Sequence, residues 1–542
     1  MFRRLPTSLK WITLSSLGMG GIYTYDNNTE AKLIQRNIRT FYNGIALAVD
    51  YKLYGGDKAN LGALHERVAN RIFDVFEKNG GLYIKMGQVI ATQSAVLPAA
   101  YQRRAKRLLD DAPAVSEQSI QQVFLEEFGV LPQDIFLNFD PQPVASASIA
   151  QVHKATLPSG EIVAVKVQKP AVRKQMEWDL RAFRILLHLY EYVFELPLTF
   201  AAGYIERHIR EEVDFENEAR NGEKAMQNLS QLSRLKNQVH IPKIYPEFSS
   251  ERVLVCEWVD GVKLTDIDKI ESLGLDYKEA MKIAIDAFAS QIFISGFVHG
   301  DPHAGNVLVR SNPVDKKKVQ VVLIDHGLYV KESAQFRLQY CKLWQAIFML
   351  DLKTLSEVCS EWGIHDVDMF ASITLQKPFV PDKAVHIQQT SLHDVYQFQT
   401  DMKARLKNFL ENQEQFPREL IFLSRNMEIV RGNNKLVGSP VNRINIMAKW
   451  AVRGIDDDQK RVFESKGQWL RYHIQSNLRR LIFNMTLIVM SISFWMIQFR
   501  QAINKKLLGK ASLGFEDLVD ERMKEQMYLQ YGIEIDEKMF DA

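Results

Sequence analysis

The sequence predicts an α+β fold of two lobes, with a helical extension before them and a hydrophobic helix after them. Three observations carry this prediction. Short β-rich runs occur around Val163 and between Val307 and Ile324. Apolar residues recur at three- and four-residue spacings through most of the remaining chain. A chain of 542 residues also has room for two lobes and extensions, because a single core rarely grows beyond ~300 residues.

The composition excludes several classes of protein. The formal net charge is +3, and no long basic stripe with interleaved aromatic residues is present, so we expect no nucleic-acid partner. The three cysteines, Cys256, Cys341 and Cys359, are too few and too scattered for a disulfide framework or a zinc site.

Residues 1–25 have the composition of a mitochondrial targeting segment. Arg3, Arg4 and Lys10 are interspersed with Ser and Thr, and no acidic residue precedes Asp26. A secretory signal is the alternative. The apolar part of this segment is short and interrupted by glycines, which makes it a poor candidate for spanning a bilayer.

Residues 26–140 are predicted to form a helical extension. Leu64, Val68 and Ile72 follow helical spacing, and a later helix contains Lys85, Met86, Gly87 and Gln88, a KxGQ pattern. A glycine inside a helix costs about 1 kcal/mol relative to alanine, so Gly87 indicates close approach of another backbone or a ligand. From the residues alone, Lys85 and Gln88 are better explained as solvated side chains on a helix face.

Residues 141–260 are predicted to form the β-rich first lobe. The small residues Ala145, Ser146, Ala147 and Ser148 occur where a nucleotide-binding lobe places its phosphate-covering loop, and small side chains let backbone amides reach phosphate oxygens. Any hairpin turn is the alternative. The strand from Ile162 to Val167 contains Lys166, which resembles the strand lysine that pairs with nucleotide phosphates. A solvated strand end is the simpler interpretation of that lysine.

The acidic run from Glu211 to Ala219 is predicted to be helical, with Glu212 and Asp214 on different faces. Such a run is normally a solvated helix face. In a kinase-like lobe, however, Lys166 needs an ion-pair partner from a following helix, and Glu218 lies downstream as required.

Residues 261–450 are predicted to form the second lobe, and they contain the strongest catalytic pattern. Asp301 is followed five residues later by Asn306, then by a β-rich hairpin and Asp325, His326 and Gly327. Phosphoryl transfer needs one carboxylate to orient the attacking group and further oxygen ligands to hold Mg²⁺ on the phosphates. Either Asp301 or Asn306 alone could simply cap a turn. The three positions together favour the catalytic interpretation.

The chain after Gly327 does not continue as in a protein kinase. A helical pattern begins near Glu332 and runs to Met349, and no Ala-Pro-Glu tripeptide follows. There is therefore no room for the activation segment that binds peptide substrates.

The C-terminal part begins with a predicted linker helix over residues 451–480. Leu481 to Phe499 is an uncharged run of 19 residues with arginines on both sides, which predicts a transmembrane helix over residues 481–499. A buried helix of the second lobe is the alternative, and the flanking charges leave the orientation open. Residues 500–542 are predicted to form a solvated acidic tail.

These motifs together resemble the UbiB family of atypical kinases, also called AarF-domain-containing or ABC1-like kinases, over about residues 60–440. The resemblance is closest to the mitochondrial branch distinct from the ubiquinone-biosynthesis kinase itself. It implies a protein-kinase-like two-lobed fold whose N-terminal extension lies over the active site.

The resemblance also implies roles for individual residues. Asp301 would be the catalytic acid-base position, Lys166 would pair with Glu218 and contact phosphate, and Asn306 and Asp325 would hold Mg²⁺. Lys85 and Gln88 would face the nucleotide near Glu212 and Asp214, which reverses the interpretation from the residues alone. Ser146 departs from the fuller alanine run of the family, and His326 stands where kinases have phenylalanine or a similar residue.

We therefore expect a membrane-anchored mitochondrial ATPase or kinase that binds ATP and Mg²⁺ and acts in lipid or quinone homeostasis. The expected partners are a membrane lipid or lipid-like molecule and the inner mitochondrial membrane, with protein partners also conceivable. Two alternatives stay open, a protein serine/threonine kinase and an ATP-sensing scaffold without turnover.

Overall fold

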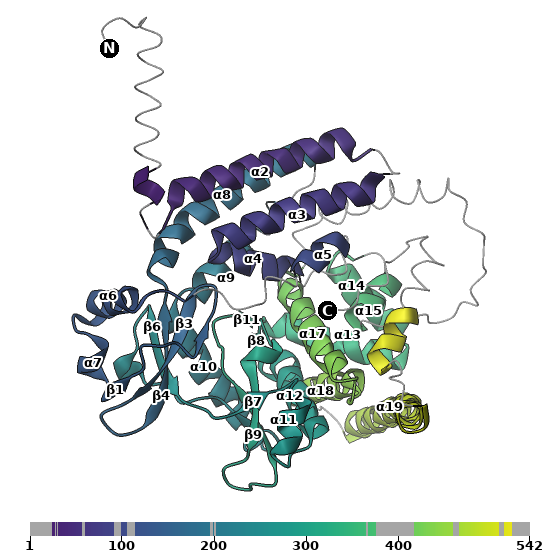
Figure 1. The fold of residues 1–542 in the computed structure, drawn as a ribbon. Coiled ribbons are helices and arrows are strands. Elements are labelled where there is room, and N and C mark those ends of the chain that lie inside the picture. The colour runs from purple at the N-terminus through teal and green to yellow at the C-terminus, as the bar shows by residue number, and fades with distance from the viewer. Residues whose placement is uncertain are drawn as a thin grey trace, which may run out of the picture. The chain divides into compact units, whose positions relative to one another are not determined.

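The computed structural model describes residues 24–27, 29, 31–56, 60–91, 99–105, 114–195, 199, 202–364, 367–375, 417–458, 466–508 and 514–522. The chain forms two compact units (Figure 1). Unit 1 comprises Met1–Asn217 with Ile244–Trp258, and unit 2 comprises Glu218–Lys243 with Val259–Ala542. Unit 1 thus joins the predicted extension to most of the predicted first lobe, while residues 218–243 of that predicted lobe belong to unit 2.

The first part of unit 1 is helical, as the apolar spacing predicts. Its helices are α2 (Leu33–Tyr54), α3 (Leu61–Asn79), α4 (Leu82–Ala91) and α5 (Ala99–Ala105). Leu64, Val68 and Phe73 are buried in a separate small core, because they recur on one face of α3. A buried ion pair between Arg36 of α2 and Asp179 of the long helix α8 (Pro170–Phe194) also holds this extension within unit 1.

The second part of unit 1 is an antiparallel sheet with strand order β1-β3-β4-β6, in which β2 also pairs with β3. Its strands are β1 (Asn138–Phe139), β2 (Ala145–Ser146), β3 (Ala150–Thr156), β4 (Ile162–Gln168) and β6 (Val253–Glu257). The short helices of this part are α6 (Glu117–Phe128), α7 (Pro132–Ile135) and the 3-10 turn Pro246–Phe248. Val163, Val165 and Val167 alternate along β4 into a core with Phe124 of α6.

The acidic run does not form the single predicted helix. Helix α9 (Ala202–Glu212) ends before Val213, and α10 (Phe215–Ser230) begins two residues later. The Asp214 carboxylate accepts hydrogen bonds from the backbone N–H groups of Glu216 and Asn217, at 3.0 and 3.2 Å. An aspartate that caps the next helix competes with helix continuation, and this explains the break.

Unit 2 contains a second, mixed sheet of strand order β5-β10-β9-β7 and a separate antiparallel pair, β8 with β11. The strands are β5 (Val239–His240), β7 (Val262–Lys263), β8 (Phe297–His299), β9 (Val307–Ser311), β10 (Val319–Leu323) and β11 (Tyr329–Lys331). The predicted hairpin is confirmed, since β9 and β10 pair antiparallel from Val307 opposite Leu323 to Ser311 opposite Val319.

The remainder of unit 2 is helical around one large core. Its helices are α11 (Ile267–Ser272), α12 (Tyr277–Ser290), a π-helical turn (Gln291–Ser295), α13 (Ala334–Met349), α14 (Leu352–Glu361), α15 (Val367–Leu375), α17 (Glu419–Leu436), α18 (Arg443–Asp458) and α19 (Lys466–Leu508). Phe288, Phe293 and Trp344 are fully buried at its centre. Only residues 328–333 separate Gly327 from α13, so the predicted absence of an activation segment is confirmed.

The C-terminal region differs from the prediction, since residues 451–458 belong to α18 and the apolar run forms the middle of the longer helix α19. Within the described residues, one helix segment, Leu481–Asn504, is long and apolar enough to cross a membrane. The predicted solvated tail is wrong for residues 515–522, which form a helix with Phe515, Glu516, Val519 and Asp520 buried. Its acids are buried because arginines of α17 and α18 pair with them. Residues 523–542 and the targeting segment up to residue 23 lie outside the described residues.

Candidate functional site

Lys166 lies on the face of β4 opposite to the core of unit 1. Its neighbours Val165 and Val167 are fully buried in that core, while the Lys166 ammonium lies 5.2 Å from the centre of the Phe215 ring. Strand alternation therefore directs this lysine away from the core, as a phosphate-binding lysine requires. Glu218, its expected partner, is buried one turn into α10 and belongs to unit 2. The pairing of Lys166 with Glu218 stays a prediction.

The predicted phosphate-covering loop is a tight turn from β2 to β3. The Ala147 N–H donates to the Ala150 carbonyl at 2.8 Å, and Ser146 pairs with Gln151 across the strands. The hydroxyl oxygens of Ser146 and Ser148 are both buried, and in the described part of the chain neither has a hydrogen-bond partner. Buried hydroxyls normally have partners. Two such groups in one loop fit a site that a phosphate group completes.

Lys169 holds this loop by contacts that the sequence did not reveal. Its ammonium donates to the Ala147 carbonyl at 2.7 Å, and its backbone N–H donates to the Ile149 carbonyl at 2.9 Å. Burial lowers the pKa of Lys169 to about 8. It follows Lys166 by three residues, and its place next to Pro170 at the start of α8 gave no signal of this contact.

Lys85 and Glu212 are brought together, as expected from the resemblance. The Lys85 ammonium of α4 lies 2.5 Å from a carboxylate oxygen of Glu212, the last residue of α9, and both side chains are largely buried. A paired, largely buried lysine is not a solvated residue on a helix face, so the interpretation from the residues alone is wrong for Lys85. The Gln88 side chain lies outside the described residues.

Asp214 has a structural role that the prediction did not include. One carboxylate oxygen of Asp214 caps the start of α10 by accepting a hydrogen bond from the Glu216 N–H. Val213, the residue before it, is held because the Gln168 side chain donates to the Val213 carbonyl at 2.7 Å. The turn Val213 to Phe215 thus positions both Asp214 and the ring beneath Lys166. A nucleotide-directed role for Asp214 stays a prediction.

In unit 2, the chain from His299 to Asn306 forms a compact loop that orients Asp301 and Asn306. The Gly300 N–H donates to the Leu328 carbonyl at 2.8 Å, and a Cβ at Gly300 would lie 2.5 Å from Leu328 Cγ, so only glycine fits. The Asn306 side-chain amide donates to the Asp301 carbonyl at 3.2 Å. Since the amide nitrogen makes this bond, the amide oxygen of Asn306 is the atom that can bind a cation.

Asp325 lies at the end of β10, next to Asn306 at the start of β9. The Ile324 N–H donates to the Asn306 carbonyl at 3.1 Å, which joins the two positions across the hairpin. One Asp325 oxygen accepts a hydrogen bond from the Gly327 N–H at 3.1 Å. The structure therefore brings together Asp301, Asn306 and Asp325, the three residues that the spacing singled out.

His326 is a fixed structural residue. One ring nitrogen lies 3.0 Å from the Tyr329 hydroxyl, and the other lies 3.0 Å from the Leu323 carbonyl. Its own carbonyl accepts a hydrogen bond from the Asn221 side chain at 3.0 Å. With both nitrogens and the carbonyl engaged, this histidine anchors the turn that presents Asp325.

Helix α17 contributes a row of buried polar residues that the sequence analysis missed. Asn426 donates to the His299 carbonyl at 2.6 Å, and Asn433 donates to the Pro302 carbonyl at 2.9 Å. The Arg425 guanidinium, 5% exposed, lies 3.2 Å from the Asp301 carboxylate. We call these three residues the α17 clamp. Asn426 and Asn433 are seven residues apart in α17, which places both side chains on one face of the helix, and that spacing was the available signal.

His299 is completely enclosed beneath this loop. The Asp301 N–H donates to its Nδ1 at 3.0 Å, and the Gln291 side chain accepts from its backbone N–H at 3.0 Å. Burial lowers the pKa of His299, and the nearby Asp325 and Asp301 only partly oppose this. A neutral ring that accepts at Nδ1 fixes the backbone of Asp301.

The residues present fit a nucleotide with Mg²⁺. Among the described residues, no group of three or more His, Cys, Asp and Glu side chains is arranged to hold a metal ion. Protein-bound Mg²⁺ commonly takes one or two carboxylates and completes its shell with phosphate and water. In unit 2, Asp325 and the Asn306 amide oxygen would provide such a partial set for Mg²⁺. In unit 1, taken by itself, the Ser146 and Ser148 hydroxyls, which have no partner among the described residues, would provide donors for phosphate.

This fold is that of a kinase-like protein. Residues 107–359 match the family described as ABC1 atypical kinase-like domain. An ABC1 family protein of Schizosaccharomyces pombe is 40% identical over 447 residues, which cover 82% of this chain and 83% of the relative. The AarF domain-containing protein kinase 1 of Mus musculus is 30% identical, covering 85% of this chain and 90% of its own length. The chain belongs to the ABC1 atypical kinase-like family.

A relative from Dictyostelium discoideum is named as a serine/threonine-protein kinase. It is 35% identical to this chain and covers 73% of it, while the match spans 57% of the relative's own length. Some members of the family are thus named for protein phosphorylation.

Proposed function

We propose that this chain is a membrane-associated enzyme of phosphoryl transfer, an atypical kinase or ATPase that uses ATP and Mg²⁺. The observation that carries the proposal is the convergence of Asp301, Asn306 and Asp325 on one loop and hairpin of unit 2. In this proposal, Asp301 orients or deprotonates the attacking group, and Asn306 and Asp325 hold Mg²⁺, which neutralises phosphate charge.

The proposed substrate is a membrane lipid or a lipid-like molecule. Residues 328–333 are the whole connection between Gly327 and α13, so the segment on which protein kinases dock a peptide is missing. The apolar face of α19 supports a location at a membrane. The basic, acid-free composition of residues 1–25 supports mitochondrial targeting, and we propose a role in lipid or quinone homeostasis at the inner mitochondrial membrane.

Phosphate release by the purified full-length protein tests this proposal, with ATP and Mg²⁺ and with or without liposomes. We expect Asp325→Asn to lower the rate by at least about 100-fold, since even the partners of metal ligands typically contribute 10–100-fold. Asp315→Asn is the matched control, because Asp315 lies in the exposed turn between β9 and β10. Equal rates for the wild type and Asp325→Asn would contradict the proposal.

A protein serine/threonine kinase is the first alternative, favoured by the name of the Dictyostelium relative. It requires transfer of phosphate from ATP to a protein substrate and loss of that transfer in Asp301→Asn. Phosphorylation of lipid extracts but not of mitochondrial protein extracts would favour the main proposal.

An ATP-sensing scaffold without turnover is the second alternative. The ion pair of Arg425 with Asp301 favours it, because a carboxylate engaged by a buried guanidinium is less available to a substrate. This alternative predicts that Asp301→Asn keeps ATP binding and cellular function, whereas Lys166→Ala loses both. Titration with ATP, together with complementation by the two variants, separates it from the main proposal.

A further inference from the structure

Helix α19 is attached to unit 2 along one face. Phe483, Leu487 and Phe494 are buried in the large core, and the Phe483 ring lies 6.0 Å from that of Phe348 of α13. The Asn445 side chain of α18 donates to the Leu487 carbonyl at 3.1 Å and to the Ser491 hydroxyl at 2.8 Å. The apolar part of α19 is therefore packed on the lobe by both apolar and polar contacts.

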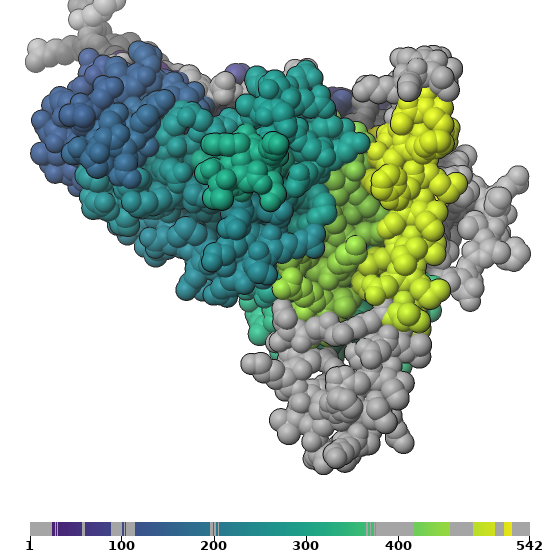
Figure 2. Space-filling view, turned by 90° about the horizontal axis from the view of Figure 1, so that it is seen from below, coloured from purple at the N-terminus to yellow at the C-terminus, as the bar shows by residue number. Residues whose placement is uncertain are grey.

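The opposite face of α19 is apolar and exposed. Figure 2 shows the helix, in yellow, lying along the green part of unit 2, with its outer side uncovered in this view. The exposed large side chains are Leu481, Ile482, Met485, Ile488, Val489, Ile492, Trp495, Met496, Phe499 and Ile503. A contiguous apolar surface of this kind marks an interaction site, because exposing it to water is unfavourable.

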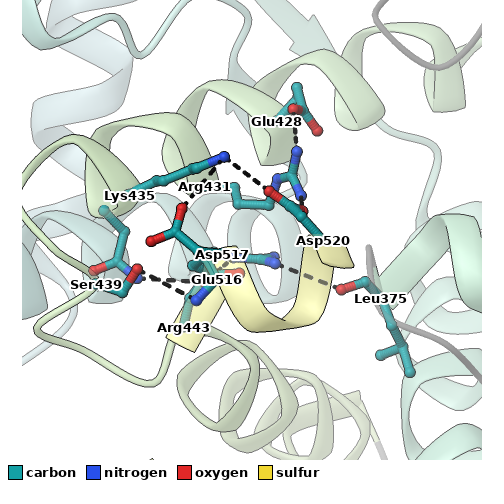
Figure 3. A network of polar contacts seen from close by, with 10 residues as sticks. Leu375, Glu428, Arg431, Lys435, Ser439, Arg443, Glu516, Asp517 and Asp520 are labelled. Carbon is teal, nitrogen blue, oxygen red and sulfur yellow. Dashed lines mark hydrogen bonds and ion pairs between the residues drawn. The ribbon is translucent and has the colours of Figure 1, made fainter. Parts of the chain in front are cut away.

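The chain returns to the same lobe after α19. Glu516 forms a fully buried ion pair with Arg443 at 3.3 Å, and Asp520 pairs with Arg431. Lys435 lies 2.9 Å from Asp520 (Figure 3). Removing one partner of such a buried pair is strongly destabilising, so residues 514–522 are firmly docked.

Further contacts join α19 to this docked segment and to the loop between α17 and α18. The Phe494 and Phe515 rings lie 5.3 Å apart, and the Gln498 side chain donates to the Ser439 carbonyl at 2.8 Å. Helix α18, which precedes α19, and residues 514–522, which follow it, thus belong to one lobe. A helix that crossed a bilayer between them would place them in opposite aqueous compartments.

We propose that α19 lies in the plane of a membrane surface and inserts its exposed apolar face into one leaflet, without crossing the bilayer. This placement keeps the buried face on the lobe and the docked segment on the same side. It uses the same long apolar helix that the sequence predicts as a span. The inference goes beyond the proposed activity, since it requires no turnover.

The charges near the exposed face identify the partner as a bilayer with anionic headgroups. Arg479 and Arg480 precede the apolar run in the sequence, and the exposed Arg500 follows it directly, while the described exposed face itself carries no acid. An amphipathic helix with basic flanks and apolar residues including tryptophan and phenylalanine is typical of an interfacial helix. Basic residues close to an anionic surface strengthen binding to it.

Flotation of the full-length protein with vesicles tests the surface. We expect binding to phosphatidylcholine vesicles that contain phosphatidylglycerol, weaker binding without it, and at least a tenfold loss of binding in the variant Ile488→Gln, Ile492→Gln, Phe499→Gln. The control replaces three exposed apolar residues elsewhere, Leu137→Gln, Tyr192→Gln and Val314→Gln. Equal vesicle binding of the two triple variants would overturn the proposal. The proposal would also be overturned if the α19 variant kept its vesicle binding and lost self-association.

A labelling experiment separates the in-plane placement from a span. Val314→Cys and Glu521→Cys, in a Cys256→Ala background, place one exposed thiol before α19 and one after it, while Cys341 and Cys359 are buried. After reconstitution into sealed vesicles, a membrane-impermeant maleimide is added and labels are counted by mass spectrometry. In-plane placement gives chains with two labels or none, whichever way they are oriented. A population with a single label would overturn the proposal.

Discussion

The predicted catalytic loop of unit 2 and the predicted phosphate-covering loop of unit 1 are held in different ways. In unit 2, the α17 clamp of Arg425, Asn426 and Asn433 binds the loop at a carboxylate and two backbone carbonyls. In unit 1, the loop has the Lys169 contact and short backbone bonds, and the described contacts leave the Ser146 and Ser148 hydroxyls buried without partners.

This difference indicates which of the two loops is formed before a ligand binds. Side chains that carry out chemistry need fixed geometry, and buried amides donating to carbonyls provide it. Unpaired buried donors have the opposite effect, because they cost free energy until a ligand accepts their hydrogen bonds. We therefore expect the acid-amide site to be preorganised and the phosphate loop to gain stability on nucleotide binding.

Asn426→Ala tests the clamp and has the largest expected effect. It removes the donor to the buried His299 carbonyl, so we expect the free energy of unfolding to fall by about 1–3 kcal/mol. Phosphate release should fall by more than tenfold, since displacement of Asp301 weakens positioning. Denaturant unfolding and phosphate-release assays measure the two effects. Ser424→Ala, an exposed neighbour on α17, is the control. Lower stability with an unchanged rate would show that the clamp only supports the fold.

Ser146→Ala and Ser148→Ala test the unpaired hydroxyls, with an intermediate effect. Neither removes a hydrogen bond of the free protein, so the unfolding free energy should stay within about 1 kcal/mol of the wild type. Affinity for ATP should fall about 2- to 12-fold per hydroxyl, the equivalent of one hydrogen bond. Calorimetric titration measures the affinity, and Ser159→Ala in the exposed β3–β4 turn is the control. If both variants bound ATP with wild-type affinity, the unpaired hydroxyls would not contribute to nucleotide binding, and the comparison between the two loops would fail.

Lys169→Met tests the lysine that holds the predicted phosphate-covering loop, through the pH dependence of stability. The pKa of Lys169 is lowered from 10.5 to about 8 by burial, so between these values the unfolded chain holds a proton that the folded chain lacks. The wild-type unfolding free energy should therefore rise with pH through this window, by about 1–2 kcal/mol relative to Lys169→Met. Denaturant unfolding at pH values below and above 8 measures it. Lys174→Met, on the exposed side of α8, should retain the wild-type slope.

Local patterns were sufficient for most of the elements, and they brought the predicted catalytic residues to one loop and hairpin. The five-residue interval from Asp301 to Asn306 and the following hairpin survive in the structure because spacing along a short loop fixes distance. Alternation in β4 likewise determined that Lys166 faces away from the core. The uncharged run from Leu481 identified the apolar helix, since length and composition are properties of the sequence.

Partners distant in the sequence were decided only by tertiary structure. The α17 clamp acts on a loop more than 100 residues earlier, and Lys169 binds a carbonyl 22 residues away. Residues 515–522 carry the composition of a solvated tail, yet Glu516 and Asp520 are buried against arginines of α17 and α18. Charge in the sequence favours solvent, and only the folded lobe supplies the opposite charges that make burial favourable. The apolar character of α19 is a property of the sequence. Its placement follows from the docking of residues 514–522 on the same lobe, which only the tertiary structure shows.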